Sequence, residues 1–129
     1  MEMRAVLDTN AVIYLQKGSL AEDLPIGEYF ISVITEMELL SFPGLDKSQQ
    51  DWLHRFLADL EIIGLDNDVK QLAIELRRQH RLRLPDAIIA ASTITCNAVL
   101  FTNDKGLTGI PALQIRSLVL RGETRSIGL

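Results

Sequence analysis

The sequence predicts a three-layer α/β/α domain built on a mainly parallel sheet of four to five strands. Two observations support this fold class: short apolar runs alternate with longer amphipathic segments, and polar or turn-forming residues separate them. Short buried strands that alternate with helices are typical of a parallel sheet covered on both faces. With 129 residues and 47% hydrophobic content, the chain is suited to one domain with an aliphatic core.

Two strand and helix units open the predicted sheet. Residues 5–7 form a short apolar strand, and the apolar residues of 11–15 suit a helix that packs on it. A second strand is expected at 29–32, followed by a helix over 33–40. In that helix the spacing of three predicts an apolar face made of Ile34, Met37 and Leu40.

The rest of the chain continues this alternation. Residues 46–60 are amphipathic, and Asp46 or Ser48 is expected to cap that helix. Trp52 and Phe56 lie on its apolar face and are expected in the core. Further strands are expected at 61–65, 98–101 and 113–115, and further helices over 66–79 and from Pro85 onward.

One domain is expected over residues 1–121, with a C-terminal tail over 122–129. The N-terminus lacks the features of a signal peptide, and residues 87–101 are too short and too polar to span a bilayer. We therefore expect a cytoplasmic protein that does not enter a membrane. The single cysteine, Cys96, cannot form an internal disulfide and is expected to be a buried, inert thiol.

Four acidic residues stand where the predicted topology can bring them to one end of the sheet. Asp8 and Asp104 follow strands, Glu38 lies on the helix after the second strand, and Asp86 lies in the first turn of the helix at Pro85. Each also has a structural explanation. Asp8 can cap a helix, and Glu38 can be a solvated helix residue. Asp86 can be stabilised by the dipole at the start of its helix, and Asp104 can support a turn.

Taken together, the four carboxylates predict a metal site. Two charges about 4 Å apart repel by roughly 4 kcal/mol at an effective dielectric near 20, so such a cluster needs protons or cations. Hard divalent cations prefer carboxylate oxygen, and the chain has no cluster of Cys or His for zinc. Mg²⁺ or Mn²⁺ is therefore the expected cofactor.

Four segments of the chain resemble a known family. They are Asp-Thr-Asn at 8–10, the run from Ile31 to Leu39, the run from Leu84 to Ala91, and Leu-Phe-Thr-Asn-Asp at 100–104. In this order and spacing they resemble a PIN domain, and most of all the VapC-type toxins of prokaryotic toxin-antitoxin pairs. The resemblance covers about residues 3–118.

This resemblance implies which residues form the site. The catalytic and metal-binding acids would be Asp8, Glu38, Asp86 and Asp104, and the supporting polar residues would be Thr9, Asn10 and Thr102. Glu38 is preferred to Glu36 because the family places its acid three residues after a threonine and directly before a leucine. Gly106 stands where many relatives carry a further acid, which favours the first metal over a second.

The resemblance also implies an activity and partners. It implies an endoribonuclease that hydrolyses RNA phosphodiester bonds with a divalent cation and without a protein nucleophile. It further implies a VapB-like antitoxin and a homodimer. An antitoxin segment or a second subunit could cover an apolar groove near the helix at 46–60.

The chain has no overall positive charge to attract RNA, since it carries 17 acidic and 13 basic residues. Four arginines nevertheless precede Asp86, and one lysine follows Asp104. These candidate RNA-binding residues are Arg77, Arg78, Arg81, Arg83 and Lys105. The arginines can equally form a solvated helix end that favours the C-terminal dipole, and both explanations stay open.

Two rival functions are compatible with parts of the sequence. A receiver-like signalling domain would use Asp66 after the third strand and Lys105 after the fourth, but it leaves Glu38 and Asp86 unexplained. A catalytically silent PIN fold would bind RNA or a protein without turnover. The presence of all four acids argues against this second alternative.

Overall fold

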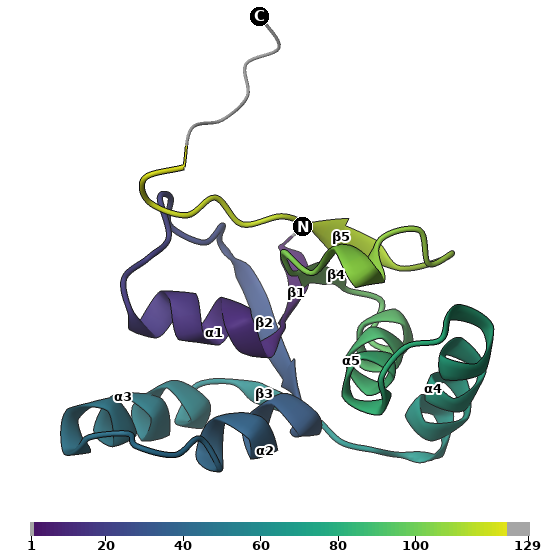
Figure 1. Cartoon of the computed structure of the whole chain (residues 1–129), viewed down its shortest axis with the longest axis horizontal. Coiled ribbons are helices and arrows are strands. Elements are labelled where there is room, and N and C mark those ends of the chain that lie inside the picture. Colours follow the sequence, from purple (N-terminus) through teal and green to yellow (C-terminus); the bar gives the residue numbers. More distant parts are fainter. Residues whose placement is uncertain (1, 124–129) are drawn as a thin grey trace, which may run out of the picture.

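The computed structural model describes residues 2–123 and has a five-stranded parallel sheet in the order β3-β2-β1-β4-β5 (Figure 1). The strands are β1 (Met3–Leu7), β2 (Gly27–Ser32), β3 (Glu61–Ile63), β4 (Val99–Phe101) and β5 (Gln114–Arg116). The helices are α1 (Thr9–Gln16), α2 (Val33–Leu40), α3 (Lys47–Ala58), α4 (Asn67–His80) and α5 (Leu84–Thr95), with a 3-10 turn η1 (Lys105–Leu107). The predicted three-layer α/β/α fold is confirmed.

Strand side chains alternate between two cores on opposite faces of the sheet. Val6 of β1 and Leu100 of β4 join the core that α4 and α5 cover. Leu7 and Phe101 join the core that α1 and α3 cover. These four side chains are at most 1% exposed, and each stabilises the fold by on the order of 1.5–3 kcal/mol when buried. Burial on both faces holds β1 and β4 at the centre of the molecule.

Asp46 and Asp66 cap the helices that follow them. Asp46, which with Ser48 was one of the two predicted caps, forms a capping box with Gln49. Asp66 accepts a hydrogen bond from the backbone N–H of Val69 at 2.9 Å. It follows the edge strand β3, whereas Lys105 follows β4 three positions away in the sheet. These two residues therefore leave the sheet far apart, which argues against the rival receiver-like function.

The predicted apolar face of α2 is also wrong in part. Met37 and Leu40 are 60% and 51% exposed, whereas Thr35 and Leu39 are buried and Ile34 is half-buried. The helix begins directly after β2 with no loop between them, and Ser32 caps it. The direction of β2 therefore decides which side of this two-turn helix meets the rest of the fold.

Three further side chains are more exposed than the sequence predicts. Trp52 and Phe56 are half-buried and stack on each other with ring centroids 4.8 Å apart, while their neighbour Leu53 is the buried residue of α3. Cys96 is half-buried rather than buried, and its sulfur accepts a hydrogen bond from the Arg4 guanidinium at 3.2 Å.

The remaining predictions concern the C-terminal tail, the domain bounds and membrane-spanning helices. The predicted tail at 122–129 falls outside the described residues from position 124 onward. The domain bounds at 1–121 stay a prediction. Within residues 2–123, none of the helices combines the length and apolar character needed to cross a bilayer.

Candidate active site

The site lies at the carboxyl end of the sheet, where the strand order reverses. Chain connections run from β1 to β2 on one side and return to β4 on the other side of β1, so β1 and β4 flank the reversal. In open parallel sheets this is where ligands bind. Asp8 directly follows β1, and Thr102 directly follows β4. The topology therefore brings residues almost a hundred positions apart to the same place.

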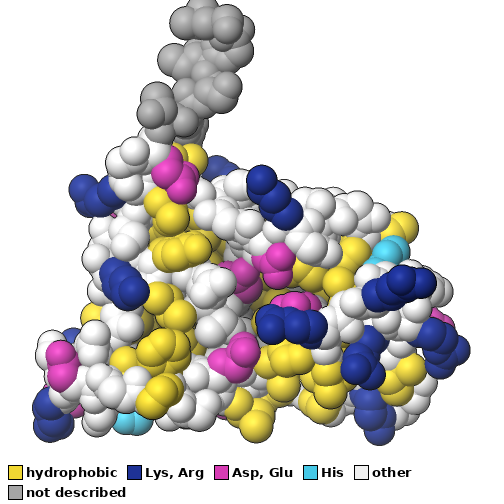
Figure 2. Space-filling model, in the orientation of Figure 1, with side chains coloured by type: hydrophobic (Ala, Val, Ile, Leu, Met, Phe, Trp, Pro, Cys, Tyr) yellow, Lys and Arg dark blue, Asp and Glu magenta, His cyan; other side chains and the backbone are white. Residues whose placement is uncertain are grey.

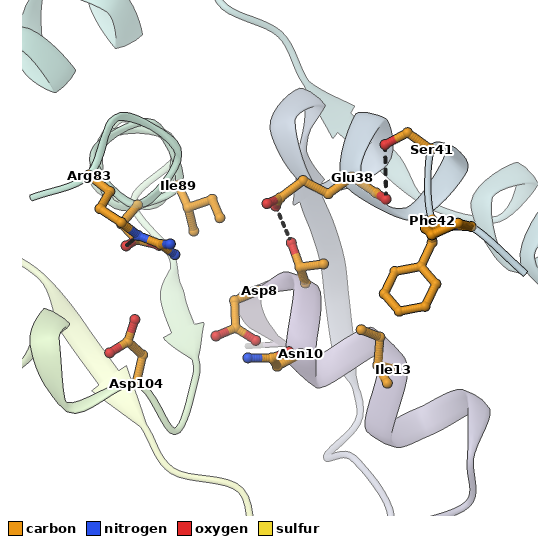
Figure 3. Close-up of a pocket in the computed structure, with 12 residues that line it drawn as sticks. Asp8, Asn10, Ile13, Glu38, Ser41, Phe42, Arg83, Ile89 and Asp104 are labelled. Atoms are coloured by element: carbon orange, nitrogen blue, oxygen red, sulfur yellow. Dashed lines mark hydrogen bonds and ion pairs between the residues drawn. The ribbon is translucent and has the colours of Figure 1, made fainter.

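A pocket of about 430 Å³ opens at this end of the sheet. All four predicted acids line it, together with Thr9, Asn10 and Arg83. Figure 3 shows Asp8, Glu38, Asp104 and Arg83 around one open space, and Figure 2 shows acidic side chains gathered in the hollow at the centre of this face. When all four acids are ionised, negative charge exceeds positive charge in the lining by three. Glu36, the alternative to Glu38, does not line this pocket.

Asp8 is the buried member of the group, with only 7% of its surface exposed. Its Oδ1 accepts a hydrogen bond from the Ala11 N–H at 2.8 Å, so Asp8 caps α1 as well as lining the pocket. Burial raises the pKa of Asp8 above 3.8; hydrogen bonds from Thr102 and Ala11 oppose the rise, and the charges of Asp104 and Asp86 add to it. The other carboxylates therefore act on Asp8 electrostatically.

Asp104 lines the pocket on the side of β4, and Thr102, which does not line it, supports Asp104. Thr102 is 1% exposed, and its Oγ1 accepts a hydrogen bond from the Asp104 N–H at 3.0 Å. Asp104 is exposed, and its Oδ1 accepts from the Gly106 N–H at 2.8 Å, which caps η1. A Cβ atom at position 106 would lie only 3.2 Å from this carboxylate oxygen. Asp104 therefore supports the turn, as predicted, and also lines the pocket.

Asn103, which was not predicted as a site residue, holds this loop in place. Its side chain accepts from the Leu118 N–H at 2.7 Å and donates to the Leu118 carbonyl at 3.0 Å. The loop that carries Asp104 is therefore tied to a segment 15 residues further along. A lone asparagine in a turn gives no sequence signal for such a contact.

Glu38 is held by the first residue of α1. Its Oε1 accepts a hydrogen bond from the Thr9 hydroxyl at 2.6 Å, and the Thr9 oxygen lies 3.2 Å from the hydroxyl oxygen of Thr35. Thr35 is fully buried and was not predicted as a site residue. Two features of the sequence indicated this contact: Thr35 lies one turn before Glu38 on the same side of the helix, and the family resemblance places a threonine three residues before the acid.

Asp86 lies in the first turn of α5, directly after Pro85, as predicted. Within residues 2–123 its side chain accepts no hydrogen bond from the helix backbone; its Oδ2 accepts one from Arg83 Nε at 3.3 Å. The Arg83 side chain is 81% exposed and that of Asp86 is 21% exposed. Arg83 therefore belongs to the acidic pocket, and the favourable helix dipole is the remaining structural role of Asp86.

The other candidate RNA-binding residues do not line the acidic pocket. Arg77, Arg78 and Arg81 line a second pocket of about 460 Å³, which also has an apolar part made of Ile74, Leu82 and Leu84. Figure 2 shows basic side chains gathered on the side of the molecule that α4 forms. Within residues 2–123 these three arginines have no ion pair. Lys105 is exposed on η1 and lines neither pocket.

The acidic pocket offers carboxylate oxygens to a cation, but its carboxylates stand apart. Within the described residues, no three Asp, Glu, His or Cys side chains are grouped closely enough to hold one ion. Arg83 pairs with Asp86 and Thr9 holds Glu38, while the charges of Asp104 and Asp86 help to raise the pKa of Asp8. The donor set consists of carboxylate oxygens, which Mg²⁺ and Mn²⁺ prefer.

The chain is similar to known proteins in both sequence and fold. Residues 5–113 match the family model of the PIN domain. A toxin-antitoxin complex from Klebsiella pneumoniae contains a chain with 31% identity and a TM-score of 0.70, over 84% of this chain and 94% of that one. VapBC2 from Rickettsia felis, bound to a promoter DNA fragment, gives 26% identity and a TM-score of 0.72, over 90% and 99%.

A further similarity concerns the fold alone. DNA-bound VapBC from Salmonella typhimurium contains a chain with 21% identity and a TM-score of 0.73, over 89% of this chain and 98% of that one. A comparison with curated proteins gave no match. The family model nevertheless covers most of the chain, with the acidic pocket inside the matched residues. This chain belongs to the PIN domain family.

Proposed function

We propose that this chain is a metal-dependent endoribonuclease and the toxin of a VapBC-type toxin-antitoxin pair. Its PIN family membership and its similarity to chains of solved toxin-antitoxin complexes support the proposal. The observation that carries it is the convergence of four carboxylates from four separate segments on one pocket. Such an arrangement opposes folding unless a cation offsets the repulsion, so it needs a functional reason.

In this proposal Asp8 and Asp86 hold Mg²⁺ or Mn²⁺, and Glu38 and Asp104 complete the site or recruit a second ion. When bound, the cation supplies positive charge that activates water and offsets charge on the phosphate and the leaving oxygen. The reaction is hydrolysis: a water oxygen adds to phosphorus, one phosphorus–ribose oxygen bond breaks, and the leaving oxygen takes up a proton. No protein nucleophile is needed.

Polar neighbours orient these acids. Thr102 lowers the pKa of the Asp8 carboxylate, and Thr9 donates a hydrogen bond to Glu38. Asn10 offers an exposed amide at the rim of the pocket. A carboxylate can accept several hydrogen bonds. Asp8 and Glu38 therefore keep oxygen lone pairs that a cation can use.

The RNA backbone is proposed to approach from the basic side of the molecule. Arg83 stands in the acidic pocket, and Arg77, Arg78 and Arg81 line the neighbouring pocket at the junction of α4 and α5. Their charges would offset the repulsion between RNA phosphates and the acids. Lys105, next to Asp104, is proposed to contact phosphate from the other wall.

A VapB-like antitoxin is the proposed protein partner. The α2 apolar surface, made of Met37, Leu40 and Phe42, is 60%, 51% and 53% exposed at these positions. Phe42 also lines the acidic pocket, so a segment that covered this surface would lie beside the site. A homodimer in the cytoplasm is proposed as well, on family likeness, and sedimentation of the purified protein tests the dimer.

Cleavage of an RNA panel by the purified, antitoxin-free protein tests the proposed activity. Cleavage should require Mg²⁺ or Mn²⁺, and Asp8→Asn or Asp86→Asn should reduce its rate by roughly 100-fold or more while circular dichroism stays unchanged. Asp68→Asn, an exposed acid in the first turn of α4, is the matched control. A wild-type rate in Asp8→Asn would contradict the site assignment. Failure of the wild type with both metals would favour the catalytically silent binding module.

A further inference from the structure

We propose that the buried Thr35 is a positioning residue for the acidic site, because it sets the orientation of the Thr9 hydroxyl that holds Glu38. This inference rests on the proposed function, since it assigns Glu38 to metal binding. Thr35 does not line the pocket, and among residues 2–123 its hydroxyl forms a hydrogen bond with Thr9 and with no acid. Its effect would be exerted through Thr9 alone.

Two consecutive hydrogen bonds link Thr35 in the interior, through Thr9, to Glu38 in the pocket. Thr35 is 0% exposed, Thr9 is half-buried, and Glu38 is exposed. The Thr35 and Thr9 hydroxyl oxygens lie 3.2 Å apart, and Thr9 Oγ1 lies 2.6 Å from Glu38 Oε1. Both distances fall within hydrogen-bond range, and the shorter one suits a bond to an ionised carboxylate.

The number of hydroxyl protons decides which residue donates in each of these two hydrogen bonds. A threonine hydroxyl has one proton to donate and two lone pairs to accept with. A carboxylate can only accept, so the Thr9 proton is committed to Glu38. The contact between the two threonines then requires the Thr35 proton. Thr35 therefore fills the accepting side of Thr9 and leaves its proton directed at Glu38.

Glu38 needs such support because its own helix does not confine it. It is exposed on α2 and has three rotatable side-chain bonds. Thr9 directly follows Asp8, so the same hydroxyl links the Glu38 carboxylate to the backbone beside the buried acid. The connection between Thr35 and Thr9 thus sets the geometry of Glu38 relative to Asp8.

Thr93 shows what a buried threonine with a purely structural role does in this fold. It is also 0% exposed, but its hydroxyl donates to the Ile89 carbonyl of its own helix at 2.8 Å. It does not line the acidic pocket. Thr93→Val removes the same group from the same kind of environment, and it is the matched control for Thr35→Val.

The experiment measures Mn²⁺ binding by titration calorimetry, without RNA, and RNA cleavage in parallel. Thr35→Val should weaken Mn²⁺ binding about 10-fold, the lower end for removal of an outer-shell partner. Thr35→Ser keeps the hydroxyl and should bind within about twofold of the wild type, as should Thr93→Val. Thr9→Val should weaken binding at least as much as Thr35→Val. The double variant should match Thr9→Val alone, because Thr35 then has nothing to orient.

The outcomes separate this inference from the proposed function. Wild-type Mn²⁺ affinity in Thr35→Val would overturn the positioning role and leave the nuclease proposal intact. Additive losses in the double variant would overturn the route through Thr9. A wild type that neither binds Mn²⁺ nor cleaves RNA would overturn both. Thr35→Ala serves as a second variant with the same expected loss if Thr35→Val fails to fold.

Discussion

Asp8 and Thr102 stand side by side at the ends of β1 and β4, the two strands that flank the reversal of the sheet order, and the Asp8 N–H donates to the Phe101 carbonyl at 3.3 Å. The Thr102 oxygen accepts a hydrogen bond from the Asp104 N–H at 3.0 Å. The buried Thr102 therefore fixes the start of the loop that carries Asp104 beside Asp8, an acid 96 residues earlier in the sequence. The pairing of β1 with β4 makes this arrangement possible.

The burial of Asp8 predicts that Asp8→Asn raises the melting temperature of the metal-free protein at pH 7. Burial raises the pKa of Asp8 above 3.8, so ionisation is disfavoured in the folded state relative to the unfolded state. The contribution of the Asp8 carboxyl to the free energy of unfolding is complete below pH 3.8, where the group is protonated in both states. That contribution is lost as the pH rises through the raised pKa of the folded state. The neutral asparagine avoids that loss.

Melting curves in the presence of a chelator, recorded from about pH 4 to pH 8, measure this effect. The advantage of Asp8→Asn over the wild type should be largest at neutral pH and should shrink as the solution becomes acidic. A variant that is less stable than the wild type by the same amount at every pH would contradict the assigned effect of burial.

The ion pair between Arg83 and Asp86 predicts that Arg83→Gln tightens Mn²⁺ binding, by about two- to fivefold. Arg83 competes with a cation for the Asp86 carboxylate, and its removal also makes the pocket more negative. The melting temperature should hardly change, because the Arg83 side chain is 81% exposed. Calorimetric titration checks this, with Arg55→Gln on α3 as the control; weaker binding in Arg83→Gln would mean that the guanidinium organises the site.

The basic pocket predicts a change in the salt dependence of RNA binding. Each of Arg77→Gln, Arg78→Gln and Arg81→Gln should reduce the slope of log affinity against log salt by about 0.7 for a single strand, since one phosphate contact is lost. The measurement uses fluorescence anisotropy in an Asp8→Asn background, so that bound RNA stays intact. An unchanged slope would identify the three arginines as a solvated helix end that favours the dipole.

The α2 apolar surface predicts where an antitoxin acts. Met37→Glu and Leu40→Glu should abolish neutralisation of the toxin by a co-expressed cognate antitoxin, because a charge replaces exposed apolar area. Their effect on the free energy of unfolding should stay within about 0.5 kcal/mol, as is usual for surface positions. Ile26→Glu, at an 88% exposed residue before β2, is the matched control in the growth assay. Full neutralisation of both variants would exclude this surface.

The sequence by itself determined the fold class and the positions of the acids along the chain. Alternating apolar runs specify strands and helices locally, and each acid stands next to the end or start of such an element. The carboxyl ends of parallel strands meet at one edge, so the gathering of Asp8 and Asp104 could be predicted without coordinates. The order of the four motifs also carried the resemblance to the family that the chain belongs to.

Only the tertiary structure decided how these residues are held. The exposed side of α2, the pairing of Arg83 with Asp86, and the contacts of Asn103 and Thr35 were absent from the sequence prediction. The rotation of a helix about its axis, and the partner of a polar side chain, depend on packing against segments that are distant in sequence. Thr9 and Thr35 are 26 residues apart, and they meet only because β1 and β2 pair and the helices after them leave the same edge of the sheet.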